Sequence, residues 1–148
     1  MIVRFVIPIL NDWESLRRLL EGVDRAMAAR GDRARVLVVD DGSVETADEA
    51  GLAGLPLPHV ESIEIARLAC NLGHQKAIAV GLALAARRAD ADWVVVMDGD
   101  GEDDPAEIPL LLAPLAEGRA PLVLAHRAKR SEGLLFRAFY LIYKSAFR

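Results

Sequence analysis

Short apolar runs alternate with segments of helical spacing along most of this chain, and this alternation constrains the fold more than any other feature. Residues 2–8, 35–39 and 93–97 are mainly apolar, and residues 61–68 alternate. Between them, apolar residues recur every three or four positions in 13–27 and 76–88. Continuous apolar runs are typical of strands buried on both faces. The pattern therefore predicts an α/β fold, a Rossmann-like and mostly parallel sheet with helices on both faces.

Local signals predict where the helices begin and end. Asn11 is expected to cap the first helix, with Glu14 reaching back as in a capping box. Gly31 is expected to end that helix, because glycine readily adopts the left-handed conformation of a helix terminus. Asp104, directly before a proline, is expected to cap a later helix that reaches residue 117.

Two short elements and a tail complete the expected organisation. Ser43 is expected to cap a short helix over 43–53, and residues 122–125 are expected to form a last short strand. We expect one domain over residues 1–130, because 148 residues suffice for one ordinary domain. Residues 131–148 are expected to form a basic amphipathic helix.

Charge is distributed unevenly along the chain. The net charge is −4, yet the last 30 residues hold seven basic side chains and one acidic side chain. An acidic body argues against a general nucleic-acid binder, since such proteins need a basic surface to displace phosphate counterions. The basic tail is suited either to a membrane surface with anionic lipid or to packing against another part of a longer protein.

Compartment signals point to the cytoplasm, with peripheral association at the inner face of the membrane. Met1 leads directly into an apolar segment that contains Arg4, without the pattern of a secretory signal. Cys70 is the only cysteine, which suits a reducing compartment. The longest apolar run, 77–86, is far shorter than the ~20 residues that cross a bilayer.

An acidic cluster follows the apolar run at 93–97. The segment MDGDGEDDP (97–105) holds five carboxylates within seven positions, and such a density is costly unless solvent or a cation relieves the repulsion. Asp98 and Asp100 are the expected ligands of Mg²⁺ or Mn²⁺, which bind one or two protein carboxylates together with substrate phosphate. The alternative is a solvated loop that caps the next helix. A calcium loop is excluded because its sixth and twelfth positions hold Asp103 and Pro109.

Two further strand ends carry polar residues suited to a nucleotide. In VVDDGS (38–43), Asp40 and Asp41 are placed to accept hydrogen bonds from a nucleobase or ribose. In NLGHQKA (71–77), Gly73 precedes a helix whose amino end favours an anion, and Lys76 adds positive charge. His74 is expected to be an ordinary surface histidine. A phosphoacceptor receiver domain also has acidic strand ends, but it begins at the strand with the paired aspartates, whereas here a strand and a helix come first.

These motifs, together with VIPILND (6–12), resemble the inverting family 2 glycosyltransferases in order and spacing. Within that family the chain looks most like the dolichol-phosphate mannosyltransferases and the bacterial polyprenyl-phosphate sugar transferases. The resemblance covers most of the chain to residue 107. The chain departs from the family pattern at Leu10, where an aromatic residue is common, and at Gly99, Gly101 and Glu102, where Ala, Leu and Gln are usual.

The resemblance implies a GT-A fold that binds a UDP- or GDP-sugar and transfers the sugar, with inversion, to a polyprenyl phosphate or another membrane-associated acceptor. Asp98 and Asp100 match the family's metal motif, and Arg127 resembles a basic residue that faces phosphate. The implied donor-binding positions are Pro8, Asp12, Asp40, Asp41, Gly73, Lys76 and Asp98. A truncated domain that binds nucleotide and metal without catalysis remains the alternative, and a homo-oligomer is left open.

Overall fold

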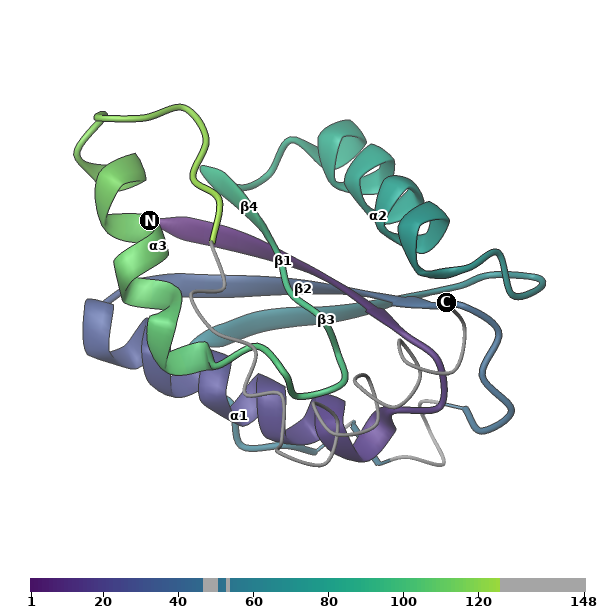
Figure 1. The fold of residues 1–148 in the computed structure, drawn as a ribbon. Helices are drawn as coiled ribbons and strands as arrows, with labels where there is room; N and C mark the ends of the chain where they lie inside the picture. Colours follow the sequence, from purple (N-terminus) through teal and green to yellow (C-terminus); the bar gives the residue numbers. More distant parts are fainter. Residues whose placement is uncertain (47–50, 53, 126–148) are drawn as a thin grey trace, which may run out of the picture.

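A computed structural model of the chain describes residues 1–46, 51–52 and 54–125 (Figure 1). Arg127 and the expected helix over 131–148 lie outside these residues. The elements follow in the order β1 (Ile2–Ile9), α1 (Trp13–Arg30), β2 (Arg33–Asp40), β3 (Val60–Arg67), α2 (His74–Arg88), β4 (Trp93–Val96), the 3₁₀ turn η1 (Pro105–Glu107) and α3 (Ile108–Ala116).

The four strands form one sheet in the order β3-β2-β1-β4, and every neighbouring pair is parallel. Strand β1 lies in the interior between β2 and β4, and Val3 to Ile9 are buried without interruption. A strand covered on both faces needs apolar side chains on both, which explains its continuous apolar sequence. The strands predicted over residues 2–8, 35–39, 61–68 and 93–97 and their parallel arrangement are confirmed.

Helices cover both faces of the sheet, with α1 and α3 on one side and α2 on the other (Figure 1). Successive strand residues point to opposite faces, so Phe5 and Ile7 join the core beneath α1. Val6 joins the smaller core beneath α2, together with Leu37. The predicted α/β fold with two covered faces is confirmed.

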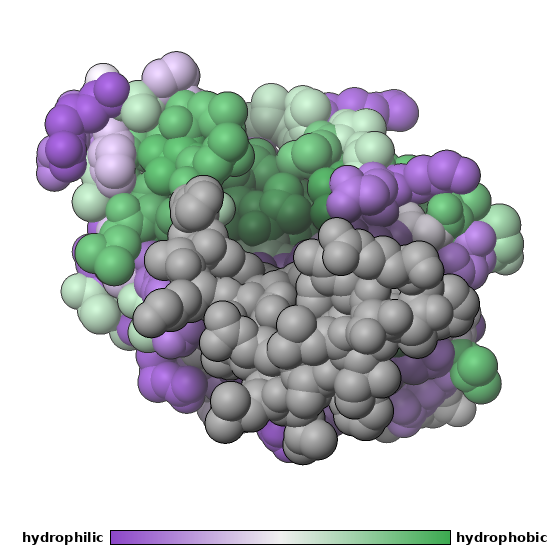
Figure 2. Space-filling model, viewed as in Figure 1, coloured by the Kyte–Doolittle hydropathy of each residue, from purple (hydrophilic) through white to green (hydrophobic). Residues whose placement is uncertain are grey.

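The apolar surface is largest around β4, which lies at one edge of the described sheet. Val94 and Val96 point away from the α1 core and are partly exposed, as is Leu82 on α2. Figure 2 shows hydrophobic side chains gathered over this region of the molecule, between α3 and α2. The α2 side of β4 is therefore less completely covered than that of β1.

The predicted capping box at the start of α1 is wrong. Asn11 lies before the helix in the left-handed region (φ 62°), and its side-chain oxygen accepts a hydrogen bond from the Val44 amide at 2.8 Å. Glu14 pairs with Arg18 one turn further on. The loop after β2 competes for the Asn11 side chain, so the helix begins at Trp13 without a side-chain cap. Gly31 does end the helix, with φ 69°.

The loop after β2 also replaces the predicted helix over 43–53, as far as the structure describes it. Residues 43–46 are not helical, and residues 47–50 and 53 lie outside the described part. The Ser43 hydroxyl accepts a hydrogen bond from the Asn11 amide instead of capping a helix. The Ser43 amide donates to Asp40. These contacts with β1 and β2 fix an irregular turn.

The third helical region confirms one predicted cap and overturns the predicted strand that follows. The Asp104 carboxylate accepts a hydrogen bond from the Ala106 amide at 2.9 Å and so caps η1, which leads into α3. Residues 122–125 pair with no described strand, and Leu122 and Leu124 are exposed. An apolar run without a neighbouring strand leaves its backbone hydrogen bonds unmade, so it does not become a strand.

Helix α2 approaches the sheet closely at Gly81. A Cβ atom at this position would overlap Val6 Cγ1 and would lie 2.9 Å from Val39 Cγ2. Both valines are β-branched and fully buried, so neither side chain has room to move. Glycine at this position sets the distance between α2 and the sheet.

We expect Gly81→Ala to lower the free energy of unfolding by about 1–2 kcal/mol. Overpacking costs about 1–3 kcal/mol, and the better helix propensity of alanine recovers at most about 1 kcal/mol. Urea denaturation measures the difference. Gly54→Ala is the control, because a Cβ there meets no atom within 4 Å. A Gly81→Ala protein as stable as the wild type would contradict the close approach.

A buried arginine organises charges on the α2 side of the sheet. The Arg4 guanidinium donates to both carboxylate oxygens of Asp90, at 3.0 and 2.6 Å, and to Glu64 at 3.0 Å. The Arg4 side chain is only 1% exposed. A buried cation is tolerated only when its charge and donors are satisfied, which these two carboxylates accomplish. The hydrogen bonds from Arg4 hold the pKa of Asp90 below its usual value.

This shift predicts how stability depends on pH. Because the folded pKa of Asp90 lies below the ordinary 3.8, the Arg4–Asp90 pair stabilises the folded state fully above that pH. The contribution is lost as the pH falls through the folded pKa. We therefore expect Asp90→Asn to be less stable than the wild type at pH 7, with a difference that shrinks below pH 3.8. Urea denaturation across this range tests it, with Glu117→Gln as an exposed control. A difference independent of pH would contradict the assignment.

Candidate functional site

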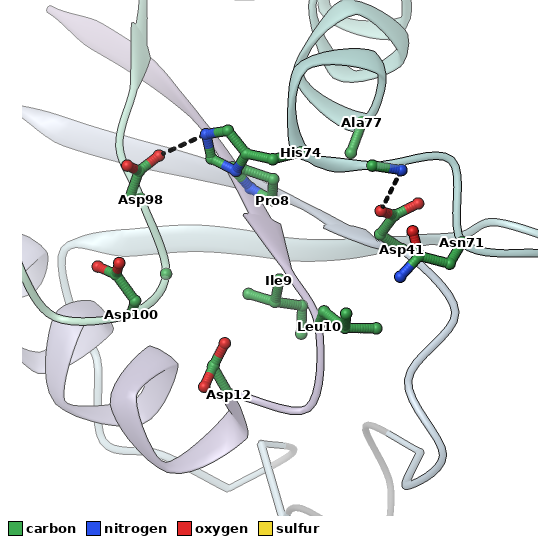
Figure 3. A pocket seen from close by; sticks show the side chains of 12 residues that line it. Pro8, Ile9, Leu10, Asp12, Asp41, Asn71, His74, Ala77, Asp98 and Asp100 are labelled. Carbon is green, nitrogen blue, oxygen red and sulfur yellow. Dashed lines mark hydrogen bonds and ion pairs between the residues drawn. The ribbon is translucent and has the colours of Figure 1, made fainter. Parts of the chain in front are cut away.

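A cavity of about 240 Å³ opens at the carboxyl edge of the sheet, where β1, β2 and β4 end (Figure 3). In parallel α/β sheets this edge is the usual place for a ligand. Its lining comes from Pro8 to Asp12, from the start of α2 and from the residues after β2 and β4. The lining residues are Pro8, Ile9, Leu10, Asp12, Asp41, Asn71, Gly73, His74, Ala77, Asp98, Gly99 and Asp100.

The end of β1 forms the floor of this cavity. Pro8 and Ile9 are buried, whereas Leu10 is 40% exposed and turns toward the opening. Asp12 follows at the start of α1 and is exposed. Pro8 and Asp12, which the sequence analysis assigned to one site, line the same cavity. Leu10 also lines it, and this was not predicted.

The adjacent residues Asp40 and Asp41 have different surroundings. Asp41 lines the cavity, and its two carboxylate oxygens accept hydrogen bonds from the amides of Leu72 and Gly73 at 2.7 and 2.9 Å (Figure 3). Asp40 does not line the cavity; its side chain is 1% exposed and accepts a hydrogen bond from the Ser43 amide at 2.7 Å. Asp41 therefore faces the ligand space, and Asp40 braces the turn behind it.

The loop before α2 and the first turn of this helix form one side of the cavity. Gly73 precedes the helix with φ 93°, a conformation that other residues rarely adopt. The amino end of α2 therefore lies beside the cavity, where the helix dipole favours an anion. Lys76 is exposed in the first turn but does not line the cavity.

Asp98 and Asp100 line the cavity from the loop after β4, as the sequence predicts. This loop is tightly folded: the Asp98 amide donates to Asp103, and the Glu102 amide donates to Asp100, both at 2.9 Å. Gly99 lies against β1, because a Cβ there would be 2.5 Å from Ile9 Cγ2 and 2.9 Å from the Pro8 carbonyl oxygen. The glycine thus lets both aspartates approach the end of β1.

His74 contacts one of these aspartates. Its Nε2 atom lies 3.2 Å from Asp98 Oδ1, across the cavity between α2 and β4 (Figure 3). This pair could not be predicted from the sequence, because the two residues belong to different motifs. Only the parallel packing of β1 beside β4, with α2 above them, brings them together.

The charges of the lining decide what the cavity can bind. Four of its residues carry carboxylates: Asp12, Asp41, Asp98 and Asp100. Within the described part of the chain, no group of three or more histidine, cysteine or acidic side chains converges closely enough to enclose a metal ion. Asp98 and Asp100 suit a cation that takes one or two protein carboxylates and completes its shell with water and phosphate, as Mg²⁺ does.

Sequence comparison now gives the class of protein to which this fold and cavity belong. The glycosyl transferase family 2 profile matches residues 5–145. The chain therefore belongs to glycosyl transferase family 2. This match decides against the receiver-domain alternative, and the predicted GT-A architecture is confirmed by the crystal structure of S. aureus TarS. That structure aligns with a TM-score of 0.63 and 18% identity over 88% of this chain and 23% of TarS.

Two curated relatives define the similarity more closely. Dodecaprenyl-phosphate galacturonate synthase of Rhizobium johnstonii is 33% identical over 137 residues, which are 89% of this chain and 38% of the relative. Undecaprenyl-phosphate 4-deoxy-4-formamido-L-arabinose transferase of Proteus mirabilis is 35% identical over 120 residues, 78% of this chain and 34% of the relative. The chain thus spans little more than a third of the length of these relatives. No helix in the described residues has the length and apolar character to cross a membrane.

The Asp41 contacts predict an effect on the loop before α2. We expect Asp41→Ala to speed hydrogen exchange at the Leu72 and Gly73 amides by about ten-fold or more, because a hydrogen bond to a charged acceptor contributes about 1.5–3 kcal/mol. Exchange measured by NMR tests this. Asp12→Ala removes a carboxylate from the same cavity without touching those amides, and equal exchange in the two variants would refute the role of Asp41.

Proposed function

We propose that this chain binds a nucleotide-sugar donor, UDP- or GDP-linked, together with Mg²⁺ or Mn²⁺ at Asp98 and Asp100. The sugar is transferred, with inversion, to a polyprenyl phosphate or another membrane-associated acceptor. Membership of glycosyl transferase family 2 supports the transfer chemistry. The names of the two relatives, both of which describe polyprenyl-phosphate sugar transferases, support the acceptor class.

The acidity of the cavity is the observation that carries this proposal. Four carboxylates line a space of about 240 Å³, and their field repels the diphosphate of a donor. A divalent cation reverses this repulsion, because it binds carboxylates and phosphate oxygens together. An acidic cavity in a family that uses nucleotide sugars is therefore best explained by a metal-dependent donor site.

Each group has a distinct part in this proposal. The metal supplies Lewis acidity that offsets the charge developing on the leaving nucleoside diphosphate. Asp98 and Asp100 hold it, and the amino end of α2 after Gly73 faces the diphosphate. Pro8, Asp12, Asp40 and Asp41 form or brace the nucleoside side, and Lys76 and Arg127 add positive charge toward phosphate.

The basic segment beyond the described residues fits a place at the membrane. Residues 126–148 hold six basic side chains and one acidic side chain. Such a segment is attracted to anionic lipid. We place the chain in the cytoplasm, peripheral at the inner face of the membrane, and leave a homo-oligomer open.

A second candidate is a domain that binds nucleotide and metal without completing transfer. The residues described around the cavity suit donor and metal binding, and they leave the acceptor side of a transfer reaction unassigned. Sugar-nucleotide turnover by the purified chain separates the two candidates. Intact donor binding with neither hydrolysis nor transfer supports the binding domain.

Calorimetry with UDP and GDP, each with and without Mn²⁺, tests the donor site. We expect Mn²⁺ to strengthen binding of one nucleotide to the wild type, and Asp100→Ala to weaken that metal-dependent binding by at least about 10-fold. Loss of an outer-shell partner alone costs about 10–100-fold in metal affinity, and a direct ligand costs no less.

Glu102→Ala is the matched control for this experiment, because it removes an acidic side chain of the same loop that does not line the cavity. We expect this variant to bind like the wild type. Equal binding by the wild type and Asp100→Ala would overturn the metal site, and no Mn²⁺ dependence in the wild type would overturn the proposed donor site.

A further inference from the structure

The contact between His74 and Asp98 joins two elements that are far apart in the sequence. His74 is the first residue of α2, and Asp98 lies just beyond β4. Their side chains meet within the cavity, with 3.2 Å between His74 Nε2 and Asp98 Oδ1 (Figure 3). The pair therefore bridges the two sides of the candidate donor site.

The position of His74 is itself fixed by the end of β2. Asp41 is buried, and its carboxylate holds the Leu72 and Gly73 amides, the last two before the helix. Gly73 then turns the chain at φ 93° into α2. A rigid set of contacts thus runs from β2 through this turn to His74, and from His74 to Asp98 after β4.

Fold stability does not explain this pair. The side chains of His74 and Asp98 are 50% and 35% exposed. Ion pairs with such exposure contribute about 0–1 kcal/mol, because water competes for both partners. The pair matters instead for where it holds the Asp98 carboxylate, since a metal ligand must keep a defined direction toward the ion.

We infer that His74 is a positioning residue that orients the Asp98 carboxylate for the donor-site cation. The inference rests on the proposed function and adds to it a residue outside the two metal ligands. His74 Nε2 donates to one oxygen of Asp98 and so limits rotation of the carboxylate about its bond to Cβ. Partners of this kind fix metal ligands in many proteins, and their loss costs about 10–100-fold in metal affinity.

Substitutions at His74 separate orientation from other roles. His74→Ala removes the donor, and His74→Gln keeps an amide N–H near the position of Nε2. Gln75→Ala is the matched control, because Gln75 lies in the same helical turn, is exposed and does not line the cavity. The half-exposed position of His74 lets each variant fold, and circular dichroism checks this.

The experiment is a Mn²⁺ titration of the full 148-residue chain, with electron paramagnetic resonance as the readout. The nucleotide that the wild type prefers is held at saturation. Calorimetry measures binding of the same nucleotide without metal. We expect His74→Ala to weaken Mn²⁺ binding by about 10-fold or more and to leave metal-free nucleotide binding unchanged. We expect His74→Gln to restore most of the Mn²⁺ affinity and Gln75→Ala to match the wild type.

Other results overturn the inference in distinguishable ways. Wild-type Mn²⁺ affinity in His74→Ala would show that Asp98 needs no orientation by His74, while the proposed donor site would stand. An equal loss of metal-free nucleotide binding would show that His74 contacts the nucleotide itself, which also contradicts a positioning role. Absence of Mn²⁺ binding in the wild type would remove the proposed donor site and this inference together.

Discussion

Parallel pairing of β1 with both β2 and β4 is the constraint on which the site depends. Because all three strands run in the same direction, the residues that follow them meet at one edge of the sheet. Pro8, Asp41 and Asp98 come from three separate regions of the chain, and this pairing alone places them around one cavity. The buried apolar surface of β1 fixes the register, since a shift of one residue would turn its core side chains to the wrong face.

The two ends of the sheet differ in how their acidic side chains are paired. On the α2 side of the sheet, the buried Arg4 pairs with Asp90 and Glu64, whose side chains remain partly exposed. At the carboxyl edge, four carboxylates line the cavity, and the described lining residues include no lysine or arginine. The cavity thus concentrates acidic side chains, which is consistent with the cation proposed to bind there.

The sequence predicted the four strands of the sheet because their signal is local, although the strand predicted over residues 122–125 did not form. Continuous apolar runs such as 93–97 need no knowledge of the rest of the chain, and the same holds for the Asp104 cap beside its proline. The errors share another cause. Asn11 and Ser43 are residue types that often cap helices, but here the side chain of each is hydrogen-bonded to the backbone of the other's loop. Such reciprocal contacts between distant segments leave no trace in local spacing.

The sequence allowed the acidic residues of the candidate site to be predicted, but not the contacts that they make with other side chains. Asp41, Asp98 and Asp100 could be predicted because they directly follow apolar strands, and Asp12 could be predicted from the family resemblance. The contact between Asp98 and His74 depends instead on how α2 packs on the sheet. The separation of Asp40 from Asp41 likewise follows from the alternation of side chains at the end of β2, which directs neighbouring residues to opposite sides.

Among the residues that the structure describes, those that line the cavity all fall between Pro8 and Asp100. The described lining of the proposed donor cavity is therefore contained in one contiguous stretch of chain, while transfer also requires an acceptor. The two relatives are more than twice as long as the stretch they share with this chain. A measurement of nucleotide and metal binding therefore tests the proposed role of this cavity independently of whether transfer takes place.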